Sequence, residues 1–345
     1  MASTVNQILK PATNDRRARA NRRQAGLLFF FRDWKPALIQ NYNGMQELLG
    51  IAIGSVVFLL MLAVGLDCTA AGFRQCTSRP GLIATVTAVQ FIGTPALVLG
   101  MISLLGVAPA TAAGLLLISA CPSGSISNTY TFLARGNATL SVALTTISCL
   151  VAFVATPLVL FLLQSLVDEQ LRGSLTLPWQ PLAKQLLVSM ALPVAIGLAL
   201  RYRFAGAIER RLDLARSCSA VLIIALIGLI VMSNPAEIGR QLQQLWMPVL
   251  AITTCLFAMA AVVANGFRLP KPERVAVFFE LPCRNLAIAA LIGLSVLERP
   301  ELIYVATAFF LLEALLLLTV AGVISRGFRR VRHPGGDEIA SDQDL

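Results

Sequence analysis

Charged and helix-breaking side chains interrupt a long apolar stretch in the last quarter of the chain. The run "FFELPCRNLA" (278–287) places Glu280, Pro282 and Arg284 within five residues. A charge at the centre of a bilayer costs roughly 2.5–3.5 kcal/mol on insertion scales, so both charged side chains must face the interior of a helix bundle. Either Glu280 pairs with Arg284 across one helical turn, or its carboxylate belongs to a cation site; neither interpretation excludes the other.

A second interrupted stretch, "CPSGSISNTYTFLARGNATLSVALTTISCL" (121–150), is rich in hydroxyl and amide side chains. Ser127 and Asn128 come just after the predicted helix break. Ser141 and Thr145 are four residues apart, so they share one face of the next helix. Isolated Ser and Thr residues in membranes usually bond to their own or a neighbouring helix. A broken helix also frees backbone carbonyls, so this combination predicts an oxygen cage for a small cation such as sodium.

Other side chains narrow the chemistry further. Glu313, in "FFLLEALLLL", is a second intramembrane carboxylate that could pair with Arg284, take a proton or face a transport pathway. The seven cysteines are scattered without a metal-binding spacing and are interpreted as small buried hydrophobic residues. The single histidine, His333, lies in the C-terminal tail, so no transition-metal site or histidine catalysis is expected within the membrane.

The elements that must position these residues are membrane helices. Of the 345 residues, 57% are hydrophobic and only 13% charged, and the mean hydropathy is +0.75. Soluble domains carry about 25% charged residues, and the continuous apolar runs favour helices over a barrel. Most of the nine apolar segments reach the roughly 17–25 residues that cross a bilayer. They are 48–68, 81–105, 107–121, 138–164, 185–200, 218–232, 246–264, 275–297 and 302–325.

The two interruptions fall at equivalent places in two groups of helices. Breaks are expected near 121–128 and near 280–285, each in the second-to-last helix of its group. Such paired breaks indicate a transporter built from inverted repeats. We therefore expect a basic N-terminal tail (1–47), a first repeat of four helices (48–165), a second repeat of five (180–326) and a polar C-terminal tail (327–345). The first repeat has the pattern of a five-helix repeat without its first helix.

The distribution of basic residues predicts the orientation. Fifteen lysines and arginines lie in the loops and C-terminal tail on one side, against four in the loops on the other, so that side and the C-terminus are expected to be cytoplasmic. The eight bases of residues 1–47 conflict with this arrangement. They could form a cleaved targeting segment, an interfacial element or an exception to the charge rule. We favour a poorly ordered basic tail with an interfacial stretch near 27–40.

Several sequence runs resemble the bile acid:sodium symporter family. They are "LLMLAVGLDCTAAGF", "CPSGSISN", "YTFLARGNATLSVALTTIS" and "FFELPCRNLAIAALI". The resemblance covers residues 48–325. It implies an all-α polytopic membrane protein of about nine helices, with a panel domain and a core domain in which two broken helices cross. It also implies a bacterial-type homologue in the cytoplasmic (inner) membrane.

The resemblance assigns site residues as well. The first cation site would use Ser127, Asn128, Ser141, Thr145 and Glu280. The second would use Glu280, the backbones of Leu281 and Cys283, and a glutamine whose position holds Arg284. The substrate region would include Pro122, Ser123, Pro282, Asn285 and Glu313. Two further departures are Pro282 where the family usually has glycine, and Ser123 in place of one glycine of its Pro-Gly-Gly motif.

The departure at position 284 bears on ion coupling. A guanidinium has only hydrogen-bond donors and a permanent charge, so Arg284 cannot ligate a cation and would repel one nearby. We expect the guanidinium to occupy the second cation site, paired with Glu280 and in reach of Glu313. The coupling ion would then be at most one sodium, or a proton.

The function expected from these residues is symport of an organic anion. The half-helix N-termini at the breaks would offer partial positive charge to that anion. A non-coupled channel or a receptor on the same fold is the alternative. An intramembrane enzyme is disfavoured because HExxH and GxSxG motifs are missing from the sequence. Beyond the anion, the coupling ion and the lipid bilayer, no cofactor, nucleic acid or obligate protein partner is expected.

Overall fold

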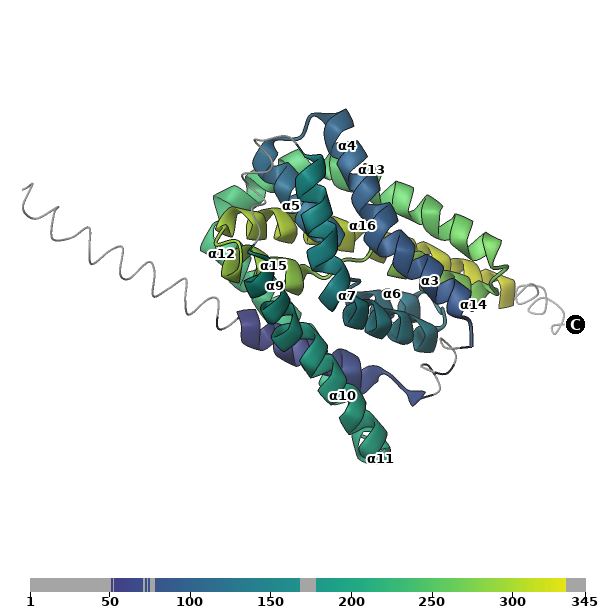
Figure 1. Ribbon diagram of the computed structural model, residues 1–345. Coiled ribbons are helices and arrows are strands. Elements are labelled where there is room, and N and C mark those ends of the chain that lie inside the picture. Colours follow the sequence, from purple (N-terminus) through teal and green to yellow (C-terminus); the bar gives the residue numbers. More distant parts are fainter. Residues whose placement is uncertain are drawn as a thin grey trace, which may run out of the picture. The chain divides into compact units, whose positions relative to one another are not determined.

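The structure is a computed structural model of the chain (Figure 1). It describes residues 51, 53–70, 72, 74, 78–167 and 178–332, with residues 213, 215, 216 and 327–332 described by their backbone alone. The elements below belong to one unit that begins at Ile53. The predicted N-terminal tail, its interfacial stretch near 27–40 and His333 lie outside the described residues.

The first group of helices contains the predicted break. In chain order it comprises Ile53–Asp67, α3 (Pro80–Ala88), the π-helical turn η1 (Val89–Gly93), α4 (Thr94–Leu105), α5 (Pro109–Ala120), α6 (Ile126–Leu133) and α7 (Ala138–Leu166). Helices α3 and α5 begin with proline, whose missing N–H group costs nothing in a first turn. Cys121 has an extended backbone that ends α5, and the chain resumes as α6 after the break.

The second group contains the other break. It comprises α9 (Trp179–Leu186), the π-helical turn η2 (Leu187–Ala191), α10 (Leu192–Arg203), α11 (Ala205–Glu209), α12 (Leu212–Ser233), α13 (Pro235–Gly266), α14 (Lys271–Glu280), α15 (Leu286–Ser295) and α16 (Pro300–Arg332). The break between α14 and α15 contains Pro282, which cannot donate a helical hydrogen bond. Both predicted breaks are therefore confirmed, and α16 continues beyond the predicted end at residue 326.

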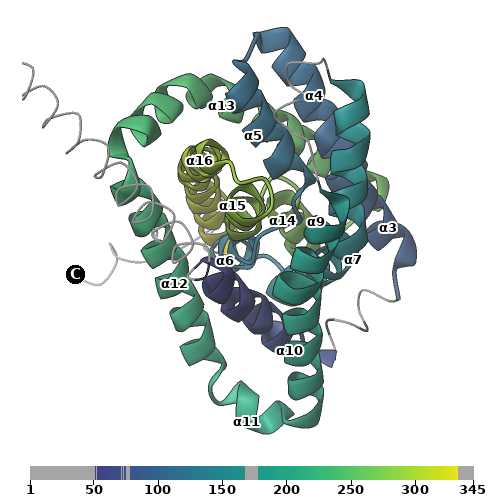
Figure 2. The same cartoon turned by 60° about the vertical axis from the view of Figure 1, so that its left-hand side comes forward.

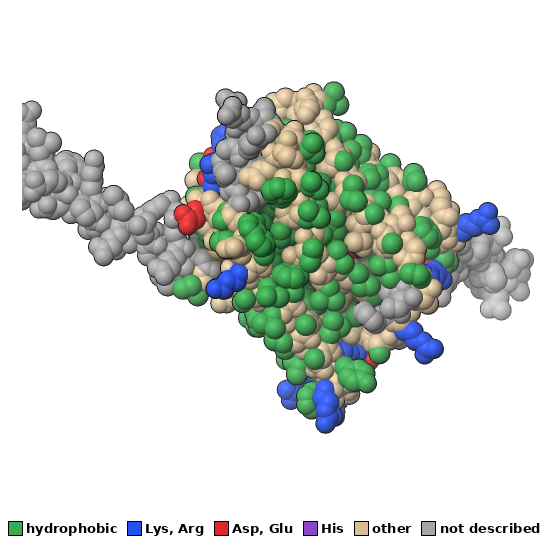
Figure 3. Space-filling view, viewed as in Figure 1, with side chains coloured by type: hydrophobic (Ala, Val, Ile, Leu, Met, Phe, Trp, Pro, Cys, Tyr) green, Lys and Arg blue, Asp and Glu red, His purple; other side chains and the backbone are tan. Residues whose placement is uncertain are grey.

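The described part of the chain is all-helical, and several of its helices have the length and the apolar composition of membrane-spanning helices. Five helical runs are long and apolar enough to span a bilayer: Pro80–Leu105, Ala138–Leu166, Trp179–Arg203, Pro235–Gly266 and Pro300–Arg326. Hydrophobic side chains spread over the face in Figure 3, whereas lysines and arginines gather at its margins. On α7, for example, Val154 and Phe161 are each 64% exposed. Large exposed apolar side chains of this kind are expected against lipid.

The half-helices α5, α6, α14 and α15 lie among the longer helices (Figures 1 and 2). Helix α5 packs against α4 and α16, and α14 packs in the equivalent way against α13 and α7. Helix α6 packs against α7, as α15 does against α16. All residues of α15 from Leu286 to Leu294 are buried. Each half-helix that precedes a break thus contacts the long final helix of the other group.

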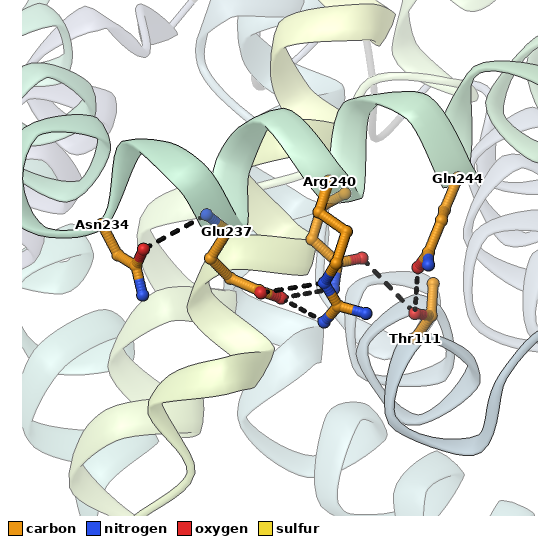
Figure 4. Close-up of polar contacts among 6 residues, drawn as sticks. Thr111, Asn234, Glu237, Arg240 and Gln244 are labelled. Carbon is orange, nitrogen blue, oxygen red and sulfur yellow. Dashed lines mark hydrogen bonds and ion pairs between the residues drawn. The ribbon is translucent and has the colours of Figure 1, made fainter.

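A polar network ties the first half-helix to α13 (Figure 4). The side chain of Asn234 caps α13 by accepting a hydrogen bond from the Glu237 N–H group at 3.2 Å. The Glu237 carboxylate accepts hydrogen bonds from Arg240 and Gln241. The Thr111 hydroxyl of α5 lies 3.4 Å from the Gln241 side-chain oxygen. This network therefore links the first turn of α5 to the first turns of α13.

Helix α10 and the Ile53–Asp67 helix approach each other backbone to backbone. A Cβ atom on Gly197 would lie 2.4 Å from the Leu62 carbonyl oxygen, and one on Gly65 would lie 2.3 Å from the Val194 carbonyl oxygen. Neither backbone can yield without separating the two helices. Small residues allow this close packing between membrane helices.

We therefore expect Gly197→Ala to destabilise the protein, because the added methyl group meets backbone atoms. Overpacking of this kind costs about 1–3 kcal/mol, and the Tm in detergent should fall by several degrees. Gly228→Ala on α12 is the matched control, since nothing lies within 4 Å of its added Cβ. Equal Tm values for the two variants would contradict the close packing.

Candidate functional site

The two helix breaks touch each other in the interior of the described unit. The Asn285 N–H group donates a hydrogen bond to the Pro122 carbonyl oxygen at 3.0 Å. A Cβ atom on Gly124 would lie 2.8 Å from the Arg284 carbonyl oxygen, so only glycine permits this approach. The Cys283 thiol lies 3.7 Å from the Gly124 carbonyl oxygen. The breaks therefore cross in direct backbone contact.

A buried carboxylate lies beside this crossing. Glu280, the last residue of α14, is fully buried. Its Oε2 accepts a hydrogen bond from the Ser127 hydroxyl at 2.9 Å. The Thr145 hydroxyl lies 3.0 Å from both carboxylate oxygens, and the Ser141 hydroxyl lies 3.5 Å from Oε2. Hydroxyl groups of two other helices, α6 and α7, thus converge on one carboxylate.

An amide oxygen completes the cluster. The Asn128 Oδ1 atom accepts a hydrogen bond from Ser141 at 2.9 Å and lies 3.2 Å from the Thr145 hydroxyl, whose hydrogen is donated to Glu280. The structure therefore brings together all five side chains of the predicted first cation site, from α6, α7 and α14. A carboxylate, three hydroxyls and an amide oxygen match the donor set of a hard cation. No group of three or more His, Cys, Asp or Glu side chains fit for a metal ion occurs within the described residues.

Two polar residues next to this cluster were missed in the sequence. Thr131 of α6 donates its hydroxyl hydrogen to the Ser141 oxygen at 3.3 Å. Gln90 of η1 is buried, and its amide lies 3.5 Å from the Glu280 carbonyl oxygen. A signal for Gln90 existed, because it is an isolated amide in the apolar segment 81–105. π-Helical turns such as η1 often mark functional positions.

Arg284 has different partners from those predicted. Its guanidinium donates hydrogen bonds to the Leu281 carbonyl at 2.9 Å and the Cys121 carbonyl at 3.3 Å. It also donates to the Thr94 hydroxyl at 2.5 Å. Among the described residues, no carboxylate oxygen lies within the 4.0 Å limit of an ion pair with it.

The predicted ion pair between Arg284 and Glu280 is therefore wrong, and of the alternatives for Glu313 the structure does not adopt an ion pair with the Arg284 guanidinium. The physical reason lies in the breaks, which leave carbonyls without helical N–H partners. The Cys121 and Leu281 carbonyls, one at each break, use the guanidinium as a donor. Glu280 is meanwhile satisfied by the hydroxyls of Ser127 and Thr145.

The remaining predicted substrate residues also lie at or near the crossing. The Asn285 side chain caps α15 by accepting a hydrogen bond from the Ile288 N–H group at 3.2 Å. The Ser123 hydroxyl and the Glu313 Oε1 atom are buried without a hydrogen-bond partner. A cavity of about 30 Å³ beside the crossing is lined by residues that include Met61, Ser125, Leu226, Arg284, Asn285 and Phe310. That volume suits a single water molecule.

Comparison with known proteins identifies the family of the chain. The family model of the Sodium Bile acid symporter family matches residues 55–241. The chain belongs to this family. Together with the apolar helices, membership in this family of sodium-dependent transporters establishes a multi-pass integral membrane protein.

Relatives from three kinds of organism match the chain. An uncharacterized sodium-dependent transporter of Bacillus subtilis is 25% identical over 232 residues, which cover 67% of this chain and 70% of the relative. The human ileal sodium/bile acid cotransporter is 25% identical over 287 residues, or 82% and 80% of the two chains. A probable chloroplastic sodium/metabolite cotransporter of Oryza sativa subsp. japonica is 30% identical over 256 residues, which cover 74% of this chain but 56% of the relative.

In this protein, the Thr145 hydroxyl should contribute more to the free energy of unfolding than the hydroxyl of its neighbour Thr146. Thr145 is a donor to the buried Glu280 carboxylate, whereas the Thr146 hydroxyl donates to the Val142 carbonyl of its own helix. Loss of a hydrogen bond to a charged group costs about 1.5–3 kcal/mol. In sodium-free detergent solution, Thr145→Val should therefore lower the Tm by more than Thr146→Val does. A larger fall for Thr146→Val would argue against the cluster.

Proposed function

We propose that the protein is a secondary active transporter, a symporter that couples the movement of an organic anion to a cation bound beside Glu280. The observation that carries this proposal is the convergence of three hydroxyls on one buried carboxylate, with the Asn128 amide oxygen beside two of those hydroxyls. A carboxylate in the interior of a membrane protein is energetically costly, so its retention there marks a functional site. The relatives named as sodium-dependent transporters support sodium as the coupling ion.

We further propose that residues 48–165 and 180–326 form inverted repeats of four and five helices. Both groups place their break in the second-to-last helix, and the half-helices make equivalent contacts. In this arrangement the crossed half-helices belong to a core domain that moves against a panel domain. The N-terminal tail (1–47) and the C-terminal tail (327–345) lie outside both repeats, and the basic loops favour a cytoplasmic C-terminus in a bacterial inner membrane.

The Arg284 guanidinium takes the place of a second cation in this proposal. Three oxygen atoms, from Cys121, Leu281 and Thr94, surround its terminal nitrogens. A mobile cation would need those same oxygens, and it would meet a fixed positive charge. The donor set around Glu280 fits a sodium ion, whereas the set around Arg284 does not. Transport would then use one sodium at most, with a proton as the alternative coupling ion.

The substrate proposed is a small organic anion bound near the crossing. The N-termini of α6 and α15 begin there, and their partial positive charge would attract an anion. The surrounding residues are Pro122, Ser123, Pro282, Asn285 and Glu313. A cavity of about 30 Å³ is too small for such a molecule, so binding requires the helices beside the crossing to separate. Alternating access supplies that separation.

A channel or receptor on the same fold is the second candidate. Counterflow separates the two, because labelled anion accumulates against its gradient in vesicles only when a carrier exchanges it for unlabelled anion. Taurocholate, estrone sulfate and pyruvate are suitable first probes. Accumulation of any of them supports a carrier, and dissipation of every gradient without exchange would contradict it.

Sodium should raise the Tm of the purified protein, because a ligand that binds the folded state stabilises it by mass action, about 2.7 kcal/mol at 100 times its Kd. Glu280→Gln should abolish this rise, measured against choline chloride of equal ionic strength. Glu237→Gln is the control, since that carboxylate pairs with Arg240 at the start of α13. A sodium response that survives in Glu280→Gln would overturn the proposed cation site.

Equilibrium dialysis with radioactive sodium tests the coupling number. We expect about one sodium per protein chain in the wild type, because the guanidinium occupies the second position. Arg284→Gln restores an amide oxygen and removes the charge, so binding should rise toward two. Two sodium ions bound to the wild-type chain would contradict the proposed role of Arg284.

A further inference from the structure

The attraction between opposite charges does not explain where the Arg284 side chain lies. Arg284 follows Glu280 by four residues, a spacing at which opposite charges on a helix pair. The helix ends between them, and the guanidinium donates instead to two carbonyls and one hydroxyl. The hydroxyl of Thr94 is its only side-chain partner among the described residues, and at 2.5 Å it is the nearest.

The Thr94 hydroxyl is oriented to accept this hydrogen bond. Its single hydrogen is donated to the Val89 carbonyl oxygen at 3.0 Å. That carbonyl is five residues back, and the π-helical turn η1 (Val89–Gly93) leaves it within reach. The lone pairs of the hydroxyl oxygen remain for Arg284. Thr94 is 1% exposed and Arg284 2% exposed, so water does not compete for the contact.

The same π-helical turn contacts both charged residues of the second break. The Gln90 amide lies 3.5 Å from the Glu280 backbone carbonyl, while Thr94, the residue that follows the turn, holds the guanidinium. Glu280 thus faces hydroxyls on one side of the break, and Arg284 faces carbonyls and Thr94 on the other. The two opposite charges are kept apart within a few residues of chain.

We propose that Thr94 is a positioning residue that holds the Arg284 guanidinium away from Glu280 and so keeps the Glu280 carboxylate available to an external cation. This inference rests on the proposed cation site. Without the Thr94 hydroxyl, a buried N–H group of Arg284 loses its partner. A carboxylate is the strongest acceptor for a guanidinium, so Arg284 would turn toward Glu280 and compete there with sodium.

The test measures the sodium concentration that gives half of the maximal Tm increase, with choline chloride keeping the ionic strength constant. We expect Thr94→Val, which is nearly isosteric, to raise this concentration about tenfold or more because the guanidinium becomes a competitor. Thr94→Ser keeps the hydroxyl and should stay close to the wild type. Thr94→Ala also removes the hydroxyl and should raise the sodium concentration at half effect as Thr94→Val does.

Two further variants separate positioning from general destabilisation. In Thr94→Val combined with Arg284→Met there is no guanidinium to release and no amide oxygen to bind a second sodium ion, so the double variant should match Arg284→Met alone. Thr156→Val is the matched control. Its buried hydroxyl donates to the Ala120 carbonyl at the end of α5 at 2.8 Å, so its loss should lower the Tm without changing the sodium concentration at half effect.

The outcomes distinguish this inference from the proposed function. If wild type shows no sodium response, the cation site itself fails and the role of Thr94 fails with it. If wild type responds but Thr94→Val and Thr94→Ala keep its half-effect concentration, only the positioning role is overturned. The same holds if the effect of Thr94→Val persists in the Arg284→Met background.

Discussion

The hydrogen bond from the Asn285 N–H group to the Pro122 carbonyl joins the two helix breaks. Within a membrane, each interrupted helix leaves backbone groups that no water can satisfy. Here each break supplies partners to the other, so neither half-helix pair is stable at this position alone. Gly124 permits the contact because a larger residue would strike the Arg284 carbonyl. The crossing is buried, and Glu280 and Arg284 are fixed on either side of the second break by the hydrogen bonds that they make there.

The crossing divides the polar groups into two environments. Glu280 lies where hydroxyls of α6 and α7 converge, and these groups can reorient so that their oxygens face a cation. Arg284 lies where carbonyls at the helix ends point, and carbonyls have no hydrogens to offer a carboxylate. The acid therefore matches the donors and the base matches the acceptors. Each side chain finds hydrogen-bond partners without the other, although the Arg284 Nε atom is buried without one.

The sequence predicted the parts of this arrangement that depend on local signals. Hydropathy located the helices, and the prolines at 122 and 282 located the breaks. The family resemblance grouped Ser127, Asn128, Ser141 and Thr145 with Glu280, although these residues come from three helices. The partners of Arg284 were predicted wrongly because they depend on contacts between distant segments. Thr94 has no distinguishing sequence context, and its role depends on a π-helical turn that changes which carbonyl its hydroxyl reaches.

A tethered cation changes the energetics of the proposed transport. With two sodium ions, a monovalent anion would move with net positive charge, and the membrane potential would contribute about 2.3 kcal/mol per 100 mV. With one sodium, the movement is electroneutral, so only the sodium gradient drives it. A tenfold gradient then supports at most tenfold accumulation, which corresponds to about 1.4 kcal/mol. In the proposed transporter, the permanent positive charge of Arg284 would replace the second sodium ion, and the membrane potential would no longer contribute to the driving force.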